Sequence, residues 1–524
     1  MAGKNLVKIR GVKILRGNLS LRRWQFRMNP KGTFRTLQYL HHMNTTPLRR
    51  ILTAFKDNFS LRVVNCLVLI NAFFNAPLNG QSAELISEVT QRDSITIRSI
   101  YNEILASGQC YEQLRSLCKD VGPRLSGSDN AQKAVFWGKS LLESYGADTV
   151  FLQEVVVPKW ERGCCENAAI HSGDKEVKVN ICALGGSVST QGIVKAQVIE
   201  VKQLSELSTL GRGAIEGKIV FFNRALDPLQ INTGAAYGGA FDQRSDGASE
   251  AARYGAVGTL VRSLTLAEDS YPHTGAMNYA DDADRIPAAA LSTSDAKILS
   301  QMLREDPELR LSMQLNCVRH PDVVSHNVIA ELRGWEFPDR YIVVGGHLDS
   351  WDKGEGAHDD GAGIVQSIEV LRTFKALGIR PRHTLRVVLF MNEENGNDGG
   401  ITYAEKAKEG KLHHVAAVES DAGGFTPRGF RIEARDDQAE KFKSWARLFE
   451  PYDLHLFQRG YSGVDIRPLK DGIAALFGLS PDSQRYFDFH HSDRDVFENV
   501  HKRELELGAG AIAGLIWLID TYGI

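Results

Sequence analysis

The sequence predicts an α/β protein in which helices cover both faces of a largely parallel sheet, accompanied by a separate, smaller β-rich domain. From residue 322 onward, strand-like apolar runs alternate with helical segments, which is typical of a parallel sheet. Between about 165 and 320, short β-type runs dominate instead. A third feature points to function, because carboxylates or histidines follow every candidate strand of the later region.

The composition is that of a globular chain with an uneven charge distribution. The 524 residues carry 62 Lys and Arg against 64 Asp and Glu, and 43% are apolar. These values exclude a collagen, a disordered low-complexity chain and a multi-span membrane protein, and they argue against a nucleic-acid-binding protein. Residues 1–62 hold 14 Lys or Arg and one acid, Asp57, so the remaining 462 residues have a net charge of −15. Such a break usually separates a targeting segment from a folded body.

The first 83 residues are predicted to be a basic segment that directs export. Its apolar run Val63–Phe74 is too short to span a bilayer, which takes roughly 20 residues. It has the size of the apolar core of a signal peptide, and Gly80–Ala83 offers a cleavage site, so 63–83 resembles a signal peptide. Met43 is an alternative initiator. We expect a secreted or periplasmic protein; the alternatives are a helix of the mature protein and an uncleaved membrane anchor.

The folded body is expected to begin with helices. Residues 84–160 read as helical, with the clearest spacing at Ile97–Ala106 and Ala131–Tyr145. The seven cysteines show no disulfide framework and no zinc-knuckle spacing, so thiols are expected. The β-rich region is marked by two strands, a short helix and a following apolar run, at Ile193–Val201, Lys218–Phe222, Ser249–Tyr254 and Gly255–Val261.

The later region supplies the parallel sheet. Its four candidate strands are Tyr341–Gly345, Leu385–Met391, Val415–Val418 and Ala474–Phe477. Helices are predicted at Gly363–Leu377 and Ala509–Thr521. Continuous apolar runs of this kind are typical of strands buried on both faces.

Polar residues gather where these strands end. The clusters are His347 with Asp349, Asp359 with Asp360, Glu393 with Glu394, Asp421, and His490 with His491 and Asp495. Ligands of open α/β sheets bind beyond the carboxyl ends of the strands, so these side chains should share one crevice. Carboxylates crowded together repel one another without a cation, and histidine with carboxylate suits zinc.

Charge arithmetic favours two zinc ions per subunit. With His347, Asp359, Glu394, Asp421 and His491 as ligands, three carboxylates, two Zn²⁺ and one bridging hydroxide sum to zero. Asp349 follows His347 by two residues and Asp495 follows His491 by four. Each carboxylate is predicted to accept a hydrogen bond from the ring nitrogen of its histidine that does not bind zinc. Glu393 is then the general base that takes a proton from the bridging water and passes it to the leaving amine.

The site motifs resemble those of the co-catalytic dizinc exopeptidases, typified by bacterial leucyl aminopeptidase and glutamate carboxypeptidase. The matching stretches are Gly346–Asp352 (GHLDSWD), Asp359–Gly361, Glu393–Glu394, Glu419–Gly423 (ESDAG), Phe489–Ser492 (FHHS), Val121–Ser128 (VGPRLSGS), Trp160–Gly163 (WERG) and Pro272–Gly275 (PHTG). The resemblance covers about residues 100–524. It implies that His347 and Asp421 bind one zinc, that Glu394 and His491 bind the other, and that Asp359 bridges them.

The resemblance also implies a fold and an assembly. We expect a phosphorylase/hydrolase-like three-layer αβα zinc-exopeptidase domain from 84–164 and 321–524, interrupted by an inserted β-rich, protease-associated domain at 165–320. The insert would lean over the cleft and bind substrate or a second subunit in a homodimer. Of the two adjacent histidines, His491 fits the ligand position, and His490 and Asp360 are expected to be structural.

The expected activity is hydrolysis of short peptides, with the polarity left open. A carboxypeptidase or dipeptidase needs a cation for the substrate carboxylate, for which Arg467, Arg485 or Arg494 are candidates, whereas an aminopeptidase needs a carboxylate near the metals. Tyr486 is a candidate donor to the oxyanion, or a packing residue. Two further classes are a non-catalytic scaffold, as in transferrin receptor, and single-zinc transfer of the glutaminyl cyclase type.

Overall fold

The computed structural model describes residues 6–9, 12–15 and 80–524, and the chain divides into two compact units, 1–83 and 84–524. In the first unit, β1 (Leu6–Ile9) and β2 (Val12–Leu15) form an antiparallel pair. The apolar run predicted as a signal at 63–74 and the candidate initiator Met43 lie outside the described residues.

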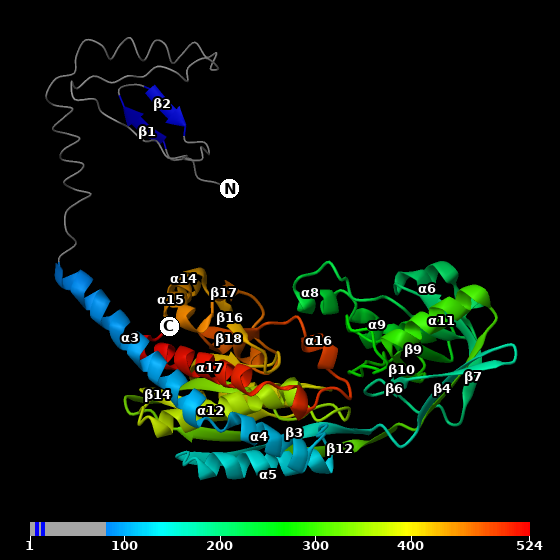
Figure 1. The fold of residues 1–524 in the computed structure, drawn as a ribbon, viewed down its shortest axis with the longest axis horizontal. Coiled ribbons are helices and arrows are strands. Elements are labelled where there is room, and N and C mark those ends of the chain that lie inside the picture. The colour runs from blue at the N-terminus through cyan, green and yellow to red at the C-terminus, as the bar shows by residue number, and fades with distance from the viewer. Residues whose placement is uncertain (1–5, 10–11, 16–79) are drawn as a thin grey trace. The chain divides into compact units, whose positions relative to one another are not determined.

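An eight-stranded mixed sheet forms the centre of the second unit (Figure 1). In spatial order its strands are β17 (Leu456–Arg459), β16 (Pro427–Ala434), β18 (Ala475–Pro481), β15 (His413–Glu419), β13 (Phe337–His347), β14 (His383–Phe390), β12 (Val318–Leu332) and β3 (Thr149–Glu161). The four neighbours β18, β15, β13 and β14 run parallel. They correspond to the four strands that the sequence predicts, although Met391 and Ala474 lie just outside β14 and β18.

The prediction that residues 84–160 are helical is wrong for the last part of that range. Thr149–Glu161 is the strand β3, which pairs antiparallel with β12 along the edge of the sheet. An edge strand with one covered face buries few side chains. Here Val155 and Val157 are buried, but Val156 between them is 61% exposed. Three valines in a row therefore hide the alternation that marks a strand.

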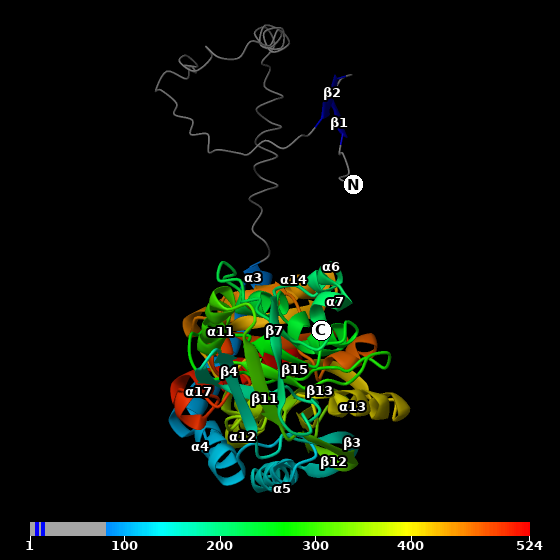
Figure 2. The ribbon, with the colours of Figure 1, turned by 90° about the vertical axis from the view of Figure 1, so that its right-hand side faces the viewer.

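Helices cover both faces of this sheet, which confirms the predicted three-layer arrangement. On β13, Val344 joins one hydrophobic core and its neighbour Val343 joins the other, as the alternation of a strand requires. The helices on the first face include α3 (Gly80–Ser107), α4 (Cys110–Ser116), α5 (Asp129–Ser144), α12 (Ala362–Ala376) and α17 (Lys502–Tyr522). Helix α13 (Asp398–Glu409) covers the other face, and Figure 2 shows α12 and α13 on opposite sides of β13. Two short helices, α14 (Asp436–Ser444) and α15 (Ala446–Phe449), follow β16.

A second eight-stranded sheet is built from residues between 166 and 315 (Figure 1). In spatial order its strands are β5 (Lys175–Val179), β4 (Glu166–Ser172), β11 (Arg310–Leu315), β7 (Val194–Val201), β8 (Ile219–Phe222), β9 (Gly258–Arg262), β10 (Ala288–Leu291) and β6 (Ile181–Ala183). Strands β7 to β10 are parallel. The helices of this region are α6 (Ser205–Leu210), α7 (Arg212–Ile215), α8 (Thr233–Gly238), α9 (Asp242–Ser245), α10 (Gly247–Ala252) and α11 (Thr293–Glu305). We call this region the insert; it contains more helix than its predicted β-rich character implies.

Helix α17 is the one helix among the described residues that is long and apolar enough to cross a membrane. Its mean hydropathy is 1.3, but 83% of the apolar window is buried within the fold. Its small residues permit this close packing, because a methyl group added to Gly510 would overlap the ring of Tyr101. The six cysteines of the described region are free thiols, as expected from their spacing.

Candidate metal centre

The chain gathers the five predicted ligands beyond the carboxyl ends of the parallel strands. His347 ends β13, Glu393 and Glu394 follow β14, Asp421 follows β15, Asp359 lies in the π-turn Ala357–Gly361 before α12, and His491 follows α16 (Tyr486–Phe489). Because neighbouring parallel strands end at the same edge, side chains far apart in sequence meet there.

The first half of the centre consists of His347 and Asp421, and we call it the His347 half. Nε2 of His347 lies 3.2 Å from Oδ1 of Asp359 and 3.5 Å from Oδ1 of Asp421. Nδ1 of His347 lies 3.1 Å from the main-chain oxygen of Asp349, to which it can donate its proton. That hydrogen bond leaves Nε2 as the acceptor nitrogen, which is the form of imidazole that binds a metal.

The second half consists of His491 and Glu394, and we call it the His491 half. Nε2 of His491 lies 3.1 Å from Oε2 of Glu394 and 3.2 Å from Oδ2 of Asp359. Its Nδ1 lies 3.2 Å from the main-chain oxygen of Thr274, a residue of the insert. The backbone of His491 has a φ of 62°, a conformation that non-glycine residues hold only when their surroundings enforce it.

Asp359 connects the two halves. Its Oδ1 faces His347 and its Oδ2 faces His491, so each oxygen can serve a different ion. The side chain is buried, and neither Oδ2 of Asp359 nor Nε2 of His347 has a hydrogen-bond partner. Buried polar atoms left without a partner are costly, which is the condition expected of ligands whose partner is a metal.

The charges of the centre fit a divalent cation. Nine carboxyl groups crowd the region: Asp349, Asp359, Asp360, Glu393, Glu394, Glu419, Asp421, Asp465 and Asp495. Burial disfavours a charged His347, but Asp359 and Asp421 outweigh it and hold the pKa of His347 well above its usual range. For His491, burial is likewise outweighed, by Glu394 and Asp359, and its pKa rises to about 9. The carboxylates thus favour positive charge at this place, and the nitrogen and oxygen donors suit zinc.

Two neighbouring residues within reach of a metal have other partners. Asp360 accepts the N–H of His347 at 3.1 Å and the N–H of Gly363 at 3.0 Å, so its oxygens stabilise the turn. The ring of His490 stacks on that of His491, with centroids 3.5 Å apart, but its Nε2 lies 3.6 Å from Oδ2 of Asp359. The contacts of Asp360 agree with the structural role that the sequence suggests for it, whereas His490 lies within reach of a metal held by Asp359 and His491.

The carboxylates of Asp349 and Asp495, predicted to bind the rings of the two histidines, accept hydrogen bonds from backbone N–H groups instead. Asp349 accepts the N–H groups of Asn392 and Glu393 at 2.7 and 3.1 Å, and its nearest oxygen lies 3.9 Å from Nδ1 of His347. Asp495 accepts the N–H groups of His358 and Asp359 at 2.7 and 3.1 Å. Main-chain oxygens of Asp349 and Thr274 take the places predicted for these two carboxylates.

Glu393, the predicted base, lies at the edge of the centre. Its Oε2 is 4.0 Å from Nε2 of His347, and its side chain is 17% exposed. Burial raises the pKa of Glu393 well above its usual range. The charge of His347 opposes this shift, and the negative charges of Asp421 and Glu394 add to it. A carboxyl group with a perturbed pKa beside such a centre is a candidate for proton transfer.

The PHTG motif of the insert explains how the His491 half is held. Thr274 donates its N–H to the main-chain oxygen of His491 at 2.9 Å, and Nδ1 of His273 contacts the main-chain oxygen of His490 at 2.7 Å. Gly275 has a φ of 139°, and a methyl group there would overlap the guanidinium of Arg244. His273 and Thr274 therefore position the two histidines, and Gly275 leaves space beside them.

Two further motifs fasten the insert to the sheet domain. Arg162 of the WERG motif makes a bidentate ion pair with Asp352, at 2.8 and 2.5 Å, and donates to Oγ1 of Thr274 at 3.2 Å. Trp351, which follows β13, packs so closely on Gly185 of the insert that a side chain at 185 would overlap its ring. The motifs outside the ligand set thus stabilise the position of the insert over the centre.

The VGPRLSGS motif supports the loops around the centre. The fully buried guanidinium of Arg124 donates to the main-chain oxygens of Leu348, Glu355 and Gly356 at 2.6, 2.7 and 2.9 Å. These oxygens belong to the loop between His347 and Asp359. The arginine therefore fixes the spacing of two ligands without contacting either.

Two hollows flank the centre and share Asp421 and Tyr486. One, of about 550 Å³, is lined by Glu393, His491 and, from the insert, Arg244. The other, of about 750 Å³, is more apolar and extends over the surface of β16 and β18. Burial raises the pKa of Tyr486 well above its usual range, so its hydroxyl keeps the proton that the predicted oxyanion role requires.

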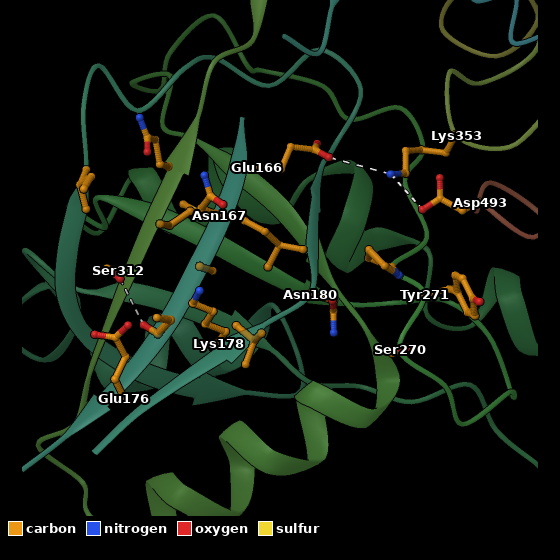
Figure 3. A pocket seen from close by; sticks show the side chains of 18 residues that line it. Glu166, Asn167, Glu176, Lys178, Asn180, Ser270, Tyr271, Ser312, Lys353 and Asp493 are labelled. Carbon is orange, nitrogen blue, oxygen red and sulfur yellow. Dashed lines mark hydrogen bonds and ion pairs between the residues drawn. The ribbon is translucent and has the colours of Figure 1, made fainter. Parts of the chain in front are cut away.

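A third hollow, of about 720 Å³, contains none of the predicted ligands (Figure 3). It lies on the insert at its border with the sheet domain. There the ammonium group of Lys353 lies between Glu166, at 4.0 Å, and Asp493, at 3.0 Å, as the dashed lines in Figure 3 mark. This hollow marks a contact between the two domains, away from the centre.

The arginines predicted as carboxylate anchors lie elsewhere. Arg485 pairs with Glu504, Arg494 pairs with Asp269, and Arg467 stacks on Tyr461. None of the three lines the hollow that contains the predicted ligands; Arg244 and Arg319 do. Sequence reasoning missed Arg244 because it lies on the short helix α9 of the insert, outside every recognised motif.

Comparisons with known proteins agree on one family. The model of "Peptidase family M28" matches residues 327–515. Carboxypeptidase Q of Bos taurus is 33% identical over 455 residues, which covers 85% of this chain and 92% of that protein. The crystal structure of a peptidase M28 precursor from Shewanella amazonensis SB2B superposes with a TM-score of 0.79 at 32% identity, over 82% of this chain and 97% of that one. A zinc aminopeptidase from Bacillus subtilis shares the fold, with a TM-score of 0.57 at 19% identity over 78% of this chain and 94% of that one.

Proposed function

The chain belongs to peptidase family M28, and on that premise we propose that it is a zinc-dependent exopeptidase of the carboxypeptidase Q type that hydrolyses short peptides. The observation that carries the proposal is the pair of histidines facing opposite oxygens of Asp359, each with its own second carboxylate. This arrangement supplies each of two ions with one imidazole, one carboxylate of its own and a shared carboxylate.

We propose two zinc ions per subunit, in the two halves described above. When bound, zinc ions of such a centre lower the pKa of a water molecule and polarise the carbonyl of the scissile bond. His347 and Asp421 would hold one ion, Glu394 and His491 the other, and Asp359 both.

The residues around the centre would move the protons. Glu393 takes a proton from the attacking water and delivers it to the nitrogen of the leaving amine, a transfer for which a raised pKa suits a carboxyl group. Tyr486 can donate a hydrogen bond to the oxygen of the tetrahedral intermediate. The hollows on either side of the centre leave room for one residue on each side of the scissile bond.

Two activities of the same family differ in the end of the peptide from which residues are released. A carboxypeptidase or dipeptidase binds a free substrate carboxylate, and the curated relative named above supports this reading. An aminopeptidase binds a free amine, and the carboxylates beside the centre, such as Asp421, could bind one. The first activity is our proposal and the second its alternative.

A panel of dipeptides and tripeptides with free or blocked ends tests this proposal. Products read by mass spectrometry should show release of single residues that stops with a chelator and returns with zinc. Peptides with a blocked carboxyl end should be poor substrates. Unchanged cleavage in the chelator, or cleavage within long unfolded chains, would contradict the proposal.

Export and pairing are further proposals. The basic segment and the apolar run at 63–74 support export to the periplasm or the cell exterior, rather than membrane anchoring. Fractionation of expressing cells, with sequencing of the mature N-terminus, tests this. The homodimer is supported by the family resemblance alone, and sedimentation equilibrium tests it; a monomer at micromolar concentration would contradict it.

A further inference from the structure

Cys164 and Cys165 are neighbouring cysteines whose thiols are in contact. Their sulfur atoms lie 3.3 Å apart, the side chain of Cys164 is exposed and that of Cys165 is half-buried. The other four described cysteines are buried, namely Cys110, Cys118, Cys182 and Cys317. Burial raises the pKa of all four thiols, which suppresses the reactive thiolate. Thiol chemistry in the described part of the chain is therefore concentrated at this pair.

The pair lies where the chain crosses from the sheet domain into the insert. It connects β3 with β4, and residues 316 and 317 make the return crossing between β11 and β12. Gly163, directly before the pair, has a φ of 80°, and a methyl group there would overlap the main-chain oxygen of Asn316. The two crossings are packed closely against each other, so a change of backbone at one disturbs the other.

The turn that contains the pair is coupled to the His491 half of the centre. Arg162 and Glu166, on either side of the turn, form an ion pair at 3.0 Å. Arg162 also donates to Oγ1 of Thr274 at 3.2 Å, and the main-chain oxygen of Thr274 lies 3.2 Å from Nδ1 of His491. A change in the shape of the turn therefore reaches His491 through two successive contacts.

We propose that Cys164 and Cys165 form a redox modification site, at which a small disulfide compound converts the two thiols into a disulfide between neighbours and weakens the His491 half of the centre. The effect on zinc rests on the proposed function, but the chemistry of the pair does not. None of the five candidate ligands is a cysteine, so an oxidant of thiols acts on the centre only through the fold.

The reaction consists of two thiol–disulfide exchanges. The thiolate of Cys164, the more exposed residue, attacks one sulfur of the external disulfide, and the other sulfur leaves as a thiolate. The thiolate of Cys165 then attacks the sulfur of Cys164 in the mixed disulfide, and the second external thiolate leaves. The leaving thiolates take up the two protons that the cysteines lost, so the pair is oxidised and the external disulfide is reduced to two thiols.

Formation of the bond changes the shape of the turn. The Cα atoms of neighbouring residues are about 3.8 Å apart across a trans peptide, whereas ordinary disulfides join Cα atoms about 4.4–6.8 Å apart. The backbone between the two cysteines must therefore rearrange when the disulfide forms. Disulfides that are strained and exposed are readily reduced again, which makes the modification reversible.

Peptide mapping tests the chemistry. Trypsin cleaves after Arg162 and Lys175, and the peptide Gly163–Lys175 contains both cysteines of the pair and no other. After treatment of the full chain with glutathione disulfide, this peptide should resist alkylation and be lighter by two hydrogen atoms, and a reductant should reverse both changes. Cys164→Ser and Cys165→Ser should instead retain a glutathione adduct. A wild-type peptide that stays alkylatable, or that keeps the adduct, would overturn the inference.

Zinc affinity tests the coupling. Competition with a zinc chelator at two successive equivalents should show the His491 half about 10-fold weaker in the oxidised than in the reduced wild type, and the His347 half unchanged. The matched control is the double variant Cys164→Ser/Cys165→Ser, which should bind zinc equally before and after the oxidant. An equal response of this variant, or unchanged affinities in an oxidised wild type, would contradict the coupling.

Hydrogen exchange separates this inference from the proposed function, because it needs neither zinc nor substrate. The amide of Thr274 donates to the main-chain oxygen of His491, so its exchange should be faster in the oxidised wild type and unaffected in the double variant. If the protein cleaves no peptide but oxidation still accelerates this exchange, the proposed function fails and the inference stands. Equal exchange in the oxidised and reduced proteins would overturn the inference whatever the enzyme hydrolyses.

Discussion

The two halves of the candidate metal centre contain the same kinds of side chain but are held by different parts of the chain. Around His347 the orienting groups come from the sheet domain: its Nδ1 meets the main chain of Asp349, whose carboxylate in turn holds the turn after β14. Around His491 they come from the insert, through the main-chain oxygen of Thr274. The difference teaches that the insert completes the centre as well as covering it. Disturbing the insert should therefore weaken one half and spare the other.

The largest expected effect removes both halves together. Asp359→Ala takes away the one carboxylate that faces both histidines, so we expect loss of both zinc ions and of activity below detection. Metal content after dialysis, read by inductively coupled plasma mass spectrometry, is the measurement. Retention of two ions would show that Asp359 does not bridge the halves.

The second-largest effect is expected from a variant that keeps zinc in both halves of the centre. Glu393→Gln removes a proton carrier without removing a ligand, so zinc content should stay normal while kcat falls by about 10²–10⁴-fold. Stopped assays at saturating substrate with the zinc-loaded variant give this number. Near-normal turnover would place the base elsewhere.

A third change should separate the halves. Arg162→Met releases the Thr274 loop, so the zinc affinity of the His491 half should fall by about 10–100-fold while that of the His347 half holds. Competition with a zinc chelator, followed at two successive equivalents, measures both sites. The control is Arg435→Met, an exposed arginine paired with Asp437. Equal weakening of both sites would contradict the division into halves.

The smallest effect concerns pH. Burial lowers the pKa of His273 to about 4, although its hydrogen bond to His490 opposes this. In the unfolded chain His273 has its ordinary pKa of about 6.5 and takes up a proton below that pH. In the folded protein it stays neutral down to about pH 4, so the free energy of unfolding decreases as the pH falls from about 6.5 to about 4. Between pH 7.5 and 5.5 the free energy of unfolding should fall by roughly 1 kcal/mol more for the wild type than for His273→Asn. Urea titrations at both pH values measure this, and equal pH dependence of the two proteins would refute it.

The convergence of the candidate site residues is predictable for a geometric reason. Parallel neighbours end at one edge, so residues after Gly345, Met391 and Val418 converge whatever lies between them. The four central strands are predictable because each is a continuous apolar run, as is typical of strands buried on both faces. Strand β3 is not predictable in this way, because its pairing with β12 joins segments more than 150 residues apart and depends on tertiary contact.

Contacts of single side chains are less predictable. The spacing of Asp349 and Asp495 from the histidines suits a hydrogen bond to imidazole, but both carboxylates bind N–H groups of turns that the sequence does not reveal. Arg244 escapes prediction because it lies on the short helix α9, outside the recognised motifs. Its place in the hollow beside Glu393 and His491 appears only when the insert is folded over the strand ends.

The contact between Thr274 and His491 also bears on how the protein is made. The insert precedes His347, the first of the five ligands, in the order of synthesis. Domains generally fold as units while the chain emerges, so the PHTG loop can take its shape before any ligand leaves the ribosome. The last ligand to be made, His491, then docks on a surface that is already formed. The candidate centre is therefore incomplete until His491 has been made and has docked on the insert.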